Sequence, residues 1–343
     1  MKTILVVDDN LTNLKYINLQ ISSHYKVILA KSGMQALQIC LKQRPDLILL
    51  DVNMPEMDGF ETIAKLKANP QMSNIPVIFL TANHDNETEI KALESGAMDF
   101  ITKPFEKSIL LHRIDLHLRF SSYQLNLEKT VKELEDSIVT SFAEIIDCRD
   151  EDTGGHVQRT SRYIEVLCYE LLRMGCFSNE INEPFIEIIV RAAPLHDIGK
   201  IGISDTILLK PARLTNEEFN EMKRHTIIGS DILRSMYQRT PTQNYLSWAI
   251  QIAEGHHEKY DGSGYPHQLS GNHIPLCCRI MAIPDVYDAL VSERIYRKAM
   301  SHDEACEIII SSSGSHFDPV IVEAFQNVNE KFLAIASEYL NVK

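Results

Sequence analysis

The sequence predicts a doubly wound α/β domain with five parallel strands, joined by a long helix to an all-α helical bundle. Three features of the 343-residue chain indicate this arrangement. Short apolar runs alternate with amphipathic segments near the N-terminus, residues 107–146 contain neither proline nor glycine, and helical periodicity prevails beyond Asp147. We therefore expect an α/β domain at residues 1–120, a linker helix at 121–143 and a helical domain at 144–343.

Composition and charge limit the class of protein. With 44% hydrophobic and 24% charged residues, the chain is too apolar to be disordered and long enough for two cores. Its formal net charge of -13 repels polyanions, so we expect no binding to DNA or to acidic membrane surfaces. Seven scattered cysteines without a CxxC pair suggest neither a disulfide framework nor a zinc ribbon. Because no apolar run reaches the ~18 residues of a membrane span and the N-terminus does not resemble a signal peptide, we expect a cytoplasmic protein.

Five short apolar runs predict the strands of the first domain. They lie at residues 4–7, 27–30, 47–50, 77–80 and 100–101. In a doubly wound sheet, ligands bind outside the carboxyl ends of the strands, so polar residues at those ends should lie together. These residues are Asp8, Asp9, Asp51, Thr81 and Lys103.

Three aspartates so close together would repel one another unless they shared a hard cation such as Mg2+. One carboxylate oxygen would then remain to attack phosphorus, while Lys103 and Thr81 contact the phosphoryl oxygens. For each aspartate alone, a solvated loop position is the alternative interpretation. The combination at neighbouring strand ends favours a phospho-acceptor site.

Residues 1 to about 120 resemble a response-regulator receiver domain, which has a flavodoxin-like fold. The strings ILVVDDN, LLDVNMPEMDGFE, FLTA and DFITKPF carry the resemblance. The resemblance implies that a histidine kinase transfers phosphate to Asp51. It also implies Mg2+ ligands at Asp8, Asp9 and the Asn53 carbonyl, and switch residues at Thr81, Phe100 and Lys103.

The segment that begins at Lys107 is expected to form one continuous helix. Apolar residues recur along it at Leu111, Ile114, Leu118 and Leu125, and then at Leu127, Val131, Leu134 and Ile138. The change of register between Leu125 and Leu127 would interrupt an ideal heptad seam. We expect this helix to pair with its copy in a homodimer; packing against its own domains is the alternative.

The helical domain contains a set of potential metal ligands: His156, His196, Asp197, His225, His256, His257 and Asp285. A single histidine is more often a surface or hydrogen-bonded residue than a ligand. A divalent metal, however, neutralises carboxylates and accepts imidazole nitrogens, so the whole set predicts a polynuclear metal site and metal-assisted hydrolysis. Adjacent residues on a helix point ~100 degrees apart, so two neighbours can serve one cluster only if they flank it closely or if one bridges two ions. The expected helices cover residues 157–174, 183–193, 216–236, 245–256, 279–290 and 302–312.

Residues from about 144 to 330 resemble the HD-GYP family, a branch of the HD phosphohydrolases. The string HHEKYDGSGYP is highly specific, and AAPLHDIGKIGISDTILLKPARLT, IPDVYDALVSERIYR and GSHFDP fall in their expected order. The resemblance implies hydrolysis of cyclic di-GMP to pGpG, with GMP as a further product, at a centre of two or three iron or manganese ions. It implies metal ligation by Asp152, His156, His196, Asp197, His225, His256, His257 and Asp285, with Asp197 as the bridge. It assigns catalytic roles to Asp197 and Lys200. The residues that would contact substrate are Lys200, Tyr265, Asp288, Arg294 and Arg297. Asp150 also falls on a position that matches the family's site.

Two residues depart from the family pattern. Asp152 stands four residues before His156, where members with three metals carry glutamate, so a third ion would depend on a side chain one methylene shorter. Pro284 precedes the predicted ligand Asp285 where alanine is usual, and it removes a backbone donor. We expect ligation by Asp285 to survive.

Two alternatives stay open for the function. The helical domain could bind cyclic di-GMP, or a partner such as a GGDEF diguanylate cyclase, with weak or no catalysis, although the complete ligand set and Lys200 argue against this. The substrate could also be another cyclic dinucleotide, since fold does not determine substrate. Phosphorylation of Asp51 is expected to control the helical domain through the long helix, in a direction that the sequence does not reveal.

Overall fold

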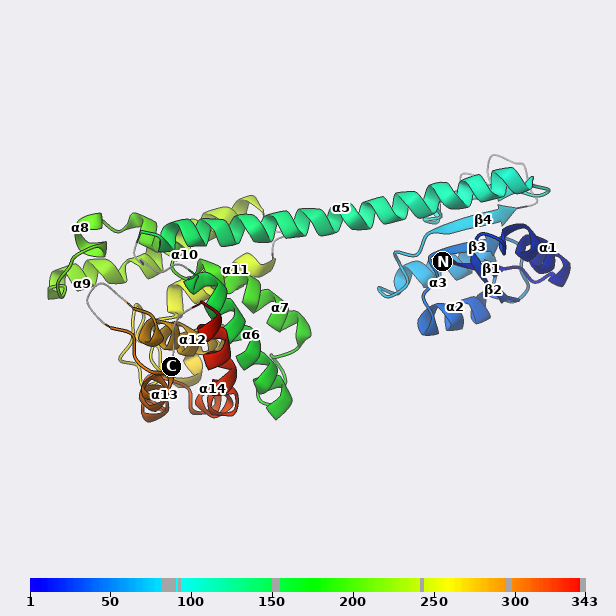
Figure 1. Cartoon of the computed structure of the whole chain (residues 1–343). Helices are drawn as coiled ribbons and strands as arrows, with labels where there is room; N and C mark the ends of the chain where they lie inside the picture. The colour runs from blue at the N-terminus through cyan, green and yellow to red at the C-terminus, as the bar shows by residue number, and fades with distance from the viewer. Residues whose placement is uncertain (82–90, 92–93, 150–154, 241–243, 294–297, 340–343) are drawn as a thin grey trace. The chain divides into compact units, whose positions relative to one another are not determined.

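The computed structural model of the chain describes residues 1–81, 91, 94–149, 155–240, 244–293 and 298–339. The chain forms two compact units, which divide between Val131 and Lys132 (Figure 1). The first unit is an α/β domain and the second is helical, as the sequence predicts. Within the described residues, no helix combines the length and the apolar character needed to cross a membrane.

Five parallel strands form the sheet of the first unit, in the order β2-β1-β3-β4-β5. They are β1 (Thr3–Val7), β2 (Lys26–Ala30), β3 (Leu47–Asp51), β4 (Val77–Thr81) and β5 (Asp99–Thr102). All five runs predicted as strands are confirmed, and each neighbouring pair is parallel. Because the inner strands of such a sheet are covered on both faces, β1, β3 and β4 are apolar and buried along almost their whole length.

Helices cover both faces of this sheet. Within the part of the chain that the structure describes, they are α1 (Leu11–Ile21), α2 (Gly33–Lys42), α3 (Gly59–Ala68) and the first turns of α5 (Lys107–Asp147). One apolar core joins α2 and α3 to Leu5 and Val7 of β1, and a second core joins α1 and α5 to Ile4 and Val6. Alternate residues of one strand therefore point into opposite cores. The strand order reverses between β1 and β3, which leaves their carboxyl ends open to ligands.

Helix α5 runs without a break from Lys107 to Asp147, which confirms the predicted continuous helix. In the first unit, Leu110 and Ile114 are fully buried against the sheet. In the second unit, Val139, Ala143 and Ile146 are buried. One helix therefore contributes to the core of each unit.

The second unit is an all-α bundle, as predicted. Its longer helices are α6 (His156–Met174), α7 (Glu183–Ala192), α9 (Asn216–Lys223), α10 (His225–Arg239), α11 (Asn244–Gly255), α12 (Leu276–Val291), α13 (His302–Ser311) and α14 (Pro319–Tyr339). Shorter helical turns are η1 (Ala193–Leu195), η2 (Ile198–Gly202), α8 (Asp205–Leu208) and η3 (Gly271–His273). Helix α12 is buried around most of its circumference, as expected of a central helix, and α6, α11, α13 and α14 pack against it.

Two helical segments differ from the prediction. The predicted helix at residues 216–236 is two helices, α9 and α10, which meet at Arg224. Helix α9 starts at a capping box formed by Thr215 and Glu218 and buries no residue. Helix α10, in contrast, packs on α11 and η2. The two helices therefore have different packing partners and do not form one continuous helix. Helix α14 lies beyond the last predicted segment, and its Phe325 and Phe332 are fully buried in the core.

Candidate metal centre and phospho-acceptor site

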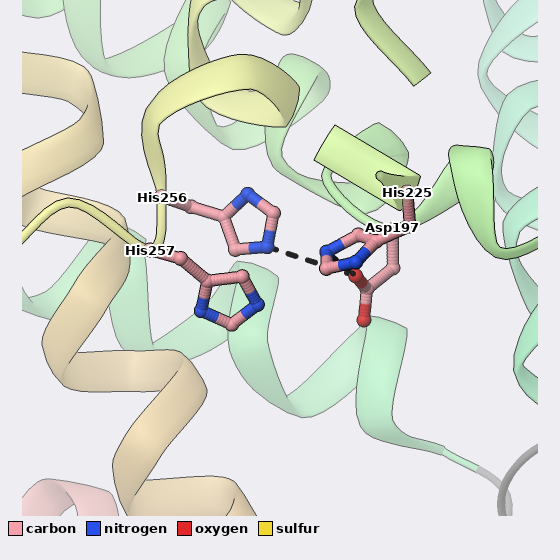
Figure 2. A group of neighbouring side chains, drawn as sticks. All are labelled: Asp197, His225, His256 and His257. Carbon is pink, nitrogen blue, oxygen red and sulfur yellow. Dashed lines mark ion pairs between the residues drawn. The ribbon is translucent and has the colours of Figure 1, made fainter. Parts of the chain in front are cut away.

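Two groups of metal-binding side chains meet in the second unit. Donor atoms of Asp197, His225, His256 and His257 lie within 4.8 Å of one another, and those of His156, His196 and Asp285 form a second group of this kind. Figure 2 shows the first group, in which His256 and His257 follow α11 and point toward Asp197 and His225. All seven residues are predicted ligands, and the bundle brings them together from separate helices.

Asp197 lies between the two groups. Its Oδ1 is 3.3 Å from Nε2 of His225 and 3.6 Å from Nε2 of His256. Its Oδ2 is 3.4 Å from Nε2 of His196, which belongs to the other group. Each carboxylate oxygen thus faces a different group, as a ligand that bridges two ions must do.

Close backbone packing brings Asp197 to His225. Asp197 lies between η1 and η2 with φ -101 and ψ 11, so it does not continue a regular helix from His196. A Cβ on Gly199 would lie 1.9 Å from the carbonyl oxygen of His225, and only glycine therefore permits this approach of η2 to α10. A Cβ on Gly264 would likewise lie 2.3 Å from the backbone nitrogen of Lys259. The absence of a side chain at Gly264 therefore allows the tight turn that follows His256 and His257.

The buried donor atoms fit divalent cations. Among the described residues, Oδ1 of Asp197 and Nε2 of His225 and of His256 are buried without hydrogen-bond partners. Such atoms are costly to bury, and a divalent ion satisfies carboxylate and imidazole ligands together. The opposite ring nitrogens are engaged, because Nδ1 of His225 donates to the Met222 carbonyl at 2.8 Å and Nδ1 of His256 donates to the Ile252 carbonyl at 2.9 Å. Each Nε2 therefore carries the lone pair and faces the centre.

The electrostatic environment favours the neutral form of two imidazoles, those of His225 and His257, and the charged form of the Asp197 carboxylate. Burial lowers the pKa of His225 to about 4, although the Asp197 charge opposes this. Burial also lowers the pKa of His257 well below its usual value, and His256 adds to the effect. Burial opposes ionisation of Asp197, but Lys200 and His196 hold the pKa of its carboxyl well below the ordinary value. Neutral imidazole and ionised carboxylate are the forms that bind metals.

Asp288 lies behind His156, with no exposed surface. Its Oδ2 accepts a 2.7 Å hydrogen bond from Nδ1 of His156, and Arg159 donates to both carboxylate oxygens, at 2.6 and 2.8 Å. Carboxylates in this position orient metal-ligating histidines. Asp288 is predicted to contact substrate, but its lack of exposed surface and its bonds to His156 and Arg159 favour an orienting role.

The remaining predicted residues of this site divide into two sets. Nζ of Lys200 lies 2.8 Å from Oδ2 of Asp197, and the Tyr265 ring lies 4.8 Å from the His257 ring. Asp285 stays in the second ligand group although Pro284 precedes it inside α12. Asp150, Asp152, Arg294 and Arg297 lie outside the residues that the structure describes.

The sequence motifs did not predict two buried charged residues near the site. Arg159 is fully buried and holds Asp288. Asp147, the last residue of α5, is also buried; burial raises the pKa of its carboxyl, and the nearby charges of His156 and Lys200 oppose this. Arg159 could have been found from its spacing, three residues after His156 on one helix. Asp147 lies in a helix rich in acidic residues and carries no comparable signal.

A third cluster lies at the carboxyl edge of the sheet in the first unit. Oxygen atoms of Asp8, Asp9 and Asp51 lie within 4.8 Å of one another. Nζ of Lys103 bonds to Asp51 and, at 2.7 Å, to Asp8. Burial raises the pKa of Asp51 although Lys103 opposes this, and the charge of Asp8 adds to the rise. Clustered carboxylates of this kind fit a hard divalent cation.

Of the other predicted residues of the first unit, Thr81 and Asn53 lie near the same edge of the sheet, whereas Phe100 pairs with Phe79, two residues before that edge. Thr81 is buried at the end of β4, and Asn53 is exposed just beyond β3. Phe100 is partly buried within β5. Asp51 ends β3 and Lys103 follows β5, and β4, which carries Thr81, lies between these two strands.

Comparison with known proteins assigns both units to families. Residues 4–115 match the response regulator receiver domain, and residues 140–321 match the HD domain. The chain therefore belongs to the HD domain family, and it is a response regulator of the HD-GYP type, with a receiver domain before the HD domain.

Three relatives are similar along almost the whole chain. A probable cyclic di-GMP phosphodiesterase of Vibrio cholerae is 41% identical over 98% of this chain and 80% of its own length. RpfG of Xanthomonas campestris, described as a cyclic di-GMP phosphodiesterase response regulator, is 37% identical over 94% of this chain and 86% of its own. A cyclic di-GMP phosphodiesterase of Thermotoga maritima is 37% identical over 96% and 91%, respectively.

Proposed function

We propose that this response regulator hydrolyses cyclic di-GMP to pGpG in its HD-GYP domain, with GMP as a further product. The observation that carries the proposal is the placement of Asp197, whose two oxygens face two separate groups of histidines. The three relatives, each described as a cyclic di-GMP phosphodiesterase, support this substrate. An anionic diester resists attack by hydroxide, so its hydrolysis needs concentrated positive charge.

The residues of the site divide between holding ions and holding substrate. The two ligand groups would hold two iron or manganese ions, which would supply an activated water and offset the charge of the diester. Lys200 orients Asp197 through its 2.8 Å ion pair and adds positive charge where the phosphate oxygens become more negative. We assign substrate contacts to Lys200 and Tyr265, with Arg294 and Arg297 as further contacts, and the ligation of a third ion to Asp152.

The test is Asp197→Ala in the full chain, purified without oxygen and assayed for metal content and for cleavage of cyclic di-GMP. We expect the parent protein to contain at least two ions and to release pGpG. The variant should lose bound metal and turnover together, because one substitution removes a ligand from both groups. Asp231→Asn, an exposed aspartate on α10, is the matched control. Cleavage by Asp197→Ala at the parent rate would contradict the scheme, and a metal-loaded parent that binds without cleaving would favour a receptor role.

We propose that a histidine kinase phosphorylates Asp51, with Mg2+ held by Asp8, Asp9 and the Asn53 carbonyl, and that α5 transmits the change. A phosphoryl group adds charge and acceptor oxygens at the edge of the sheet on which α5 packs. At the other end of α5, Arg149 donates to the carbonyls of Lys200 and Ile203 at 3.2 and 3.3 Å. The turn that follows this helix therefore contacts η2, the segment that follows Asp197 and contains Lys200.

We propose that the protein forms a homodimer through α5. The predicted stripe Leu127, Val131, Leu134 and Ile138 is about half exposed, with Leu134 at 59%. Its spacing of four and three residues matches the seam of a coiled coil, and a second copy of the helix would bury it.

A GGDEF diguanylate cyclase stays a further predicted partner. All seven cysteines are free, which supports the inferred cytoplasmic location.

A further inference from the structure

Two aromatic rings and a lysine form a continuous surface beside the histidine cluster. The Tyr265 ring centre lies 4.8 Å from that of His257, and the Phe219 ring centre lies 6.2 Å from that of Tyr265, at 81 degrees. Nζ of Lys223 lies 4.7 Å from the centre of the Phe219 ring and 5.4 Å from that of Tyr265. We call Phe219, Lys223 and Tyr265 the aromatic shelf. It begins at a predicted metal ligand and extends onto α9.

Two segments that are distant in the sequence hold the aromatic shelf in place. Phe219 and Lys223 lie one turn apart on α9, which starts at a capping box. The N–H of Tyr265 donates a 3.2 Å hydrogen bond to the His257 carbonyl, within the turn that Gly264 closes. The distance from the shelf to the ligand groups is therefore set by backbone contacts.

The shelf is accessible and carries no negative charge of its own. Phe219 is 44% exposed, a large fraction for so apolar a side chain. Among the described residues, Lys223 makes no ion pair, and its ammonium donates a 3.3 Å hydrogen bond to the Asn220 side chain. An anionic ligand with a planar ring would therefore meet a stacking surface and a cation together.

We propose that the aromatic shelf receives one guanine base of the substrate, stacked on the exposed Phe219 ring and held at its O6 and N7 edge by Lys223. The proposal rests on the proposed function, because it names a subsite for that substrate. Aromatic side chains stack on the flat face of any base, which supplies affinity. An ammonium group only donates, so it suits the O6 and N7 acceptors of guanine and conflicts with the N6 amino donor of adenine.

The stacking part is tested in the full, metal-loaded chain with Phe219→Leu, which keeps apolar bulk but removes the ring, and with Phe219→Tyr, which keeps the ring. We expect Phe219→Leu to raise KM for cyclic di-GMP about tenfold, with kcat changed less than about twofold, because stacking contributes to binding. Phe219→Tyr should retain the parent KM. Metal content should be unchanged in both variants, since Phe219 is not a ligand. An unchanged KM in active Phe219→Leu would overturn the stacking role.

The guanine preference is tested with Lys223→Met, which keeps the apolar stem and removes the charge. The probes are cyclic di-GMP as substrate and cyclic di-AMP as competitive inhibitor, because its two bases are both adenine. The guanine preference is the ratio of Ki for cyclic di-AMP to KM for cyclic di-GMP. We expect this ratio to be about fivefold lower in Lys223→Met than in the parent. Lys331→Met, an exposed lysine on α14, is the matched control and should leave this ratio unchanged.

Different failures have different signatures. Equal weakening of both dinucleotides by Lys223→Met would overturn the base-edge contact and indicate contact with phosphate. If the parent protein cleaves cyclic di-GMP but neither Phe219→Leu nor Lys223→Met alters binding, the shelf proposal alone fails. If the parent does not cleave cyclic di-GMP at all, the proposed function fails with it.

Discussion

The orientation of His156 depends on two buried side chains, Asp288 and Arg159. Asp288 accepts the Nδ1 hydrogen bond of His156, and Arg159 holds Asp288 by two hydrogen bonds. Burial opposes ionisation of Asp288, but Arg159 and His156 hold the pKa of its carboxyl below the usual value. The ionised carboxylate fixes the tautomer in which Nε2 of His156 faces the centre.

We expect Asp288→Asn to weaken metal binding without preventing folding. The amide keeps the size of the side chain but accepts the His156 hydrogen bond less strongly, so metal affinity should fall about tenfold to a hundredfold. Titration of the metal-depleted full chain, in competition with a chelator, measures this. Asp231→Asn provides the comparison, and equal affinity in the two variants would contradict the orienting role.

At the scale of elements, the proposed control depends on the contact between η2 and the turn that follows α5. Arg149 donates to two η2-region carbonyls and pairs with Asp205 at 2.6 Å. Asp147, in the last turn of the same helix, is buried near Lys200 and His156. A displacement of this helix end would therefore alter the surroundings of Asp197 and Lys200 directly.

We expect Arg149→Gln to uncouple turnover from phosphorylation. In the parent, beryllofluoride, a phosphoryl mimic, should change the rate of cyclic di-GMP cleavage, and Asp51→Asn should remove the response. Arg149→Gln should reduce the response about twofold to thirtyfold, corresponding to about 0.5–2 kcal/mol of coupling. Arg239→Gln, an exposed arginine on α10, is the control. A full response in Arg149→Gln would exclude this contact as the route.

At the scale of the whole molecule, the exposed stripe on α5 predicts self-association. Two lysines in place of Leu127 and Leu134 would put charge into the seam while preserving helix propensity. We expect the parent to be a dimer at micromolar concentration and the double variant to be a monomer, because each buried leucine contributes about 1.5–3 kcal/mol.

Sedimentation equilibrium measures the mass of both proteins. Glu133→Lys, which adds charge to α5 away from the stripe, should remain dimeric. A parent protein that is strictly monomeric would remove the paired-helix proposal and leave α5 as a connection within one chain.

Local pattern was sufficient to predict several parts of this protein. Alternation and run length predicted the five strands, and the absence of proline and glycine predicted α5, because both depend on neighbouring residues. Motif spacing also predicted that seven histidine and aspartate side chains would lie together, since nitrogen and oxygen donors in such number have few other uses in a core. The same reasoning did not separate α9 from α10, because their different packing partners lie elsewhere in the chain.

By itself, the sequence determined the class of each domain and the chemical identity of the candidate metal donors. Only the tertiary structure decided that the two oxygens of Asp197 face different ligand groups, that Asp288 faces His156, and that Arg159 completes this arrangement. The physical reason is that these contacts join residues on different helices, and their distances are set by how closely the helices pack. At Gly199, for example, the absence of a side chain lets η2 touch α10 and brings Asp197 to His225.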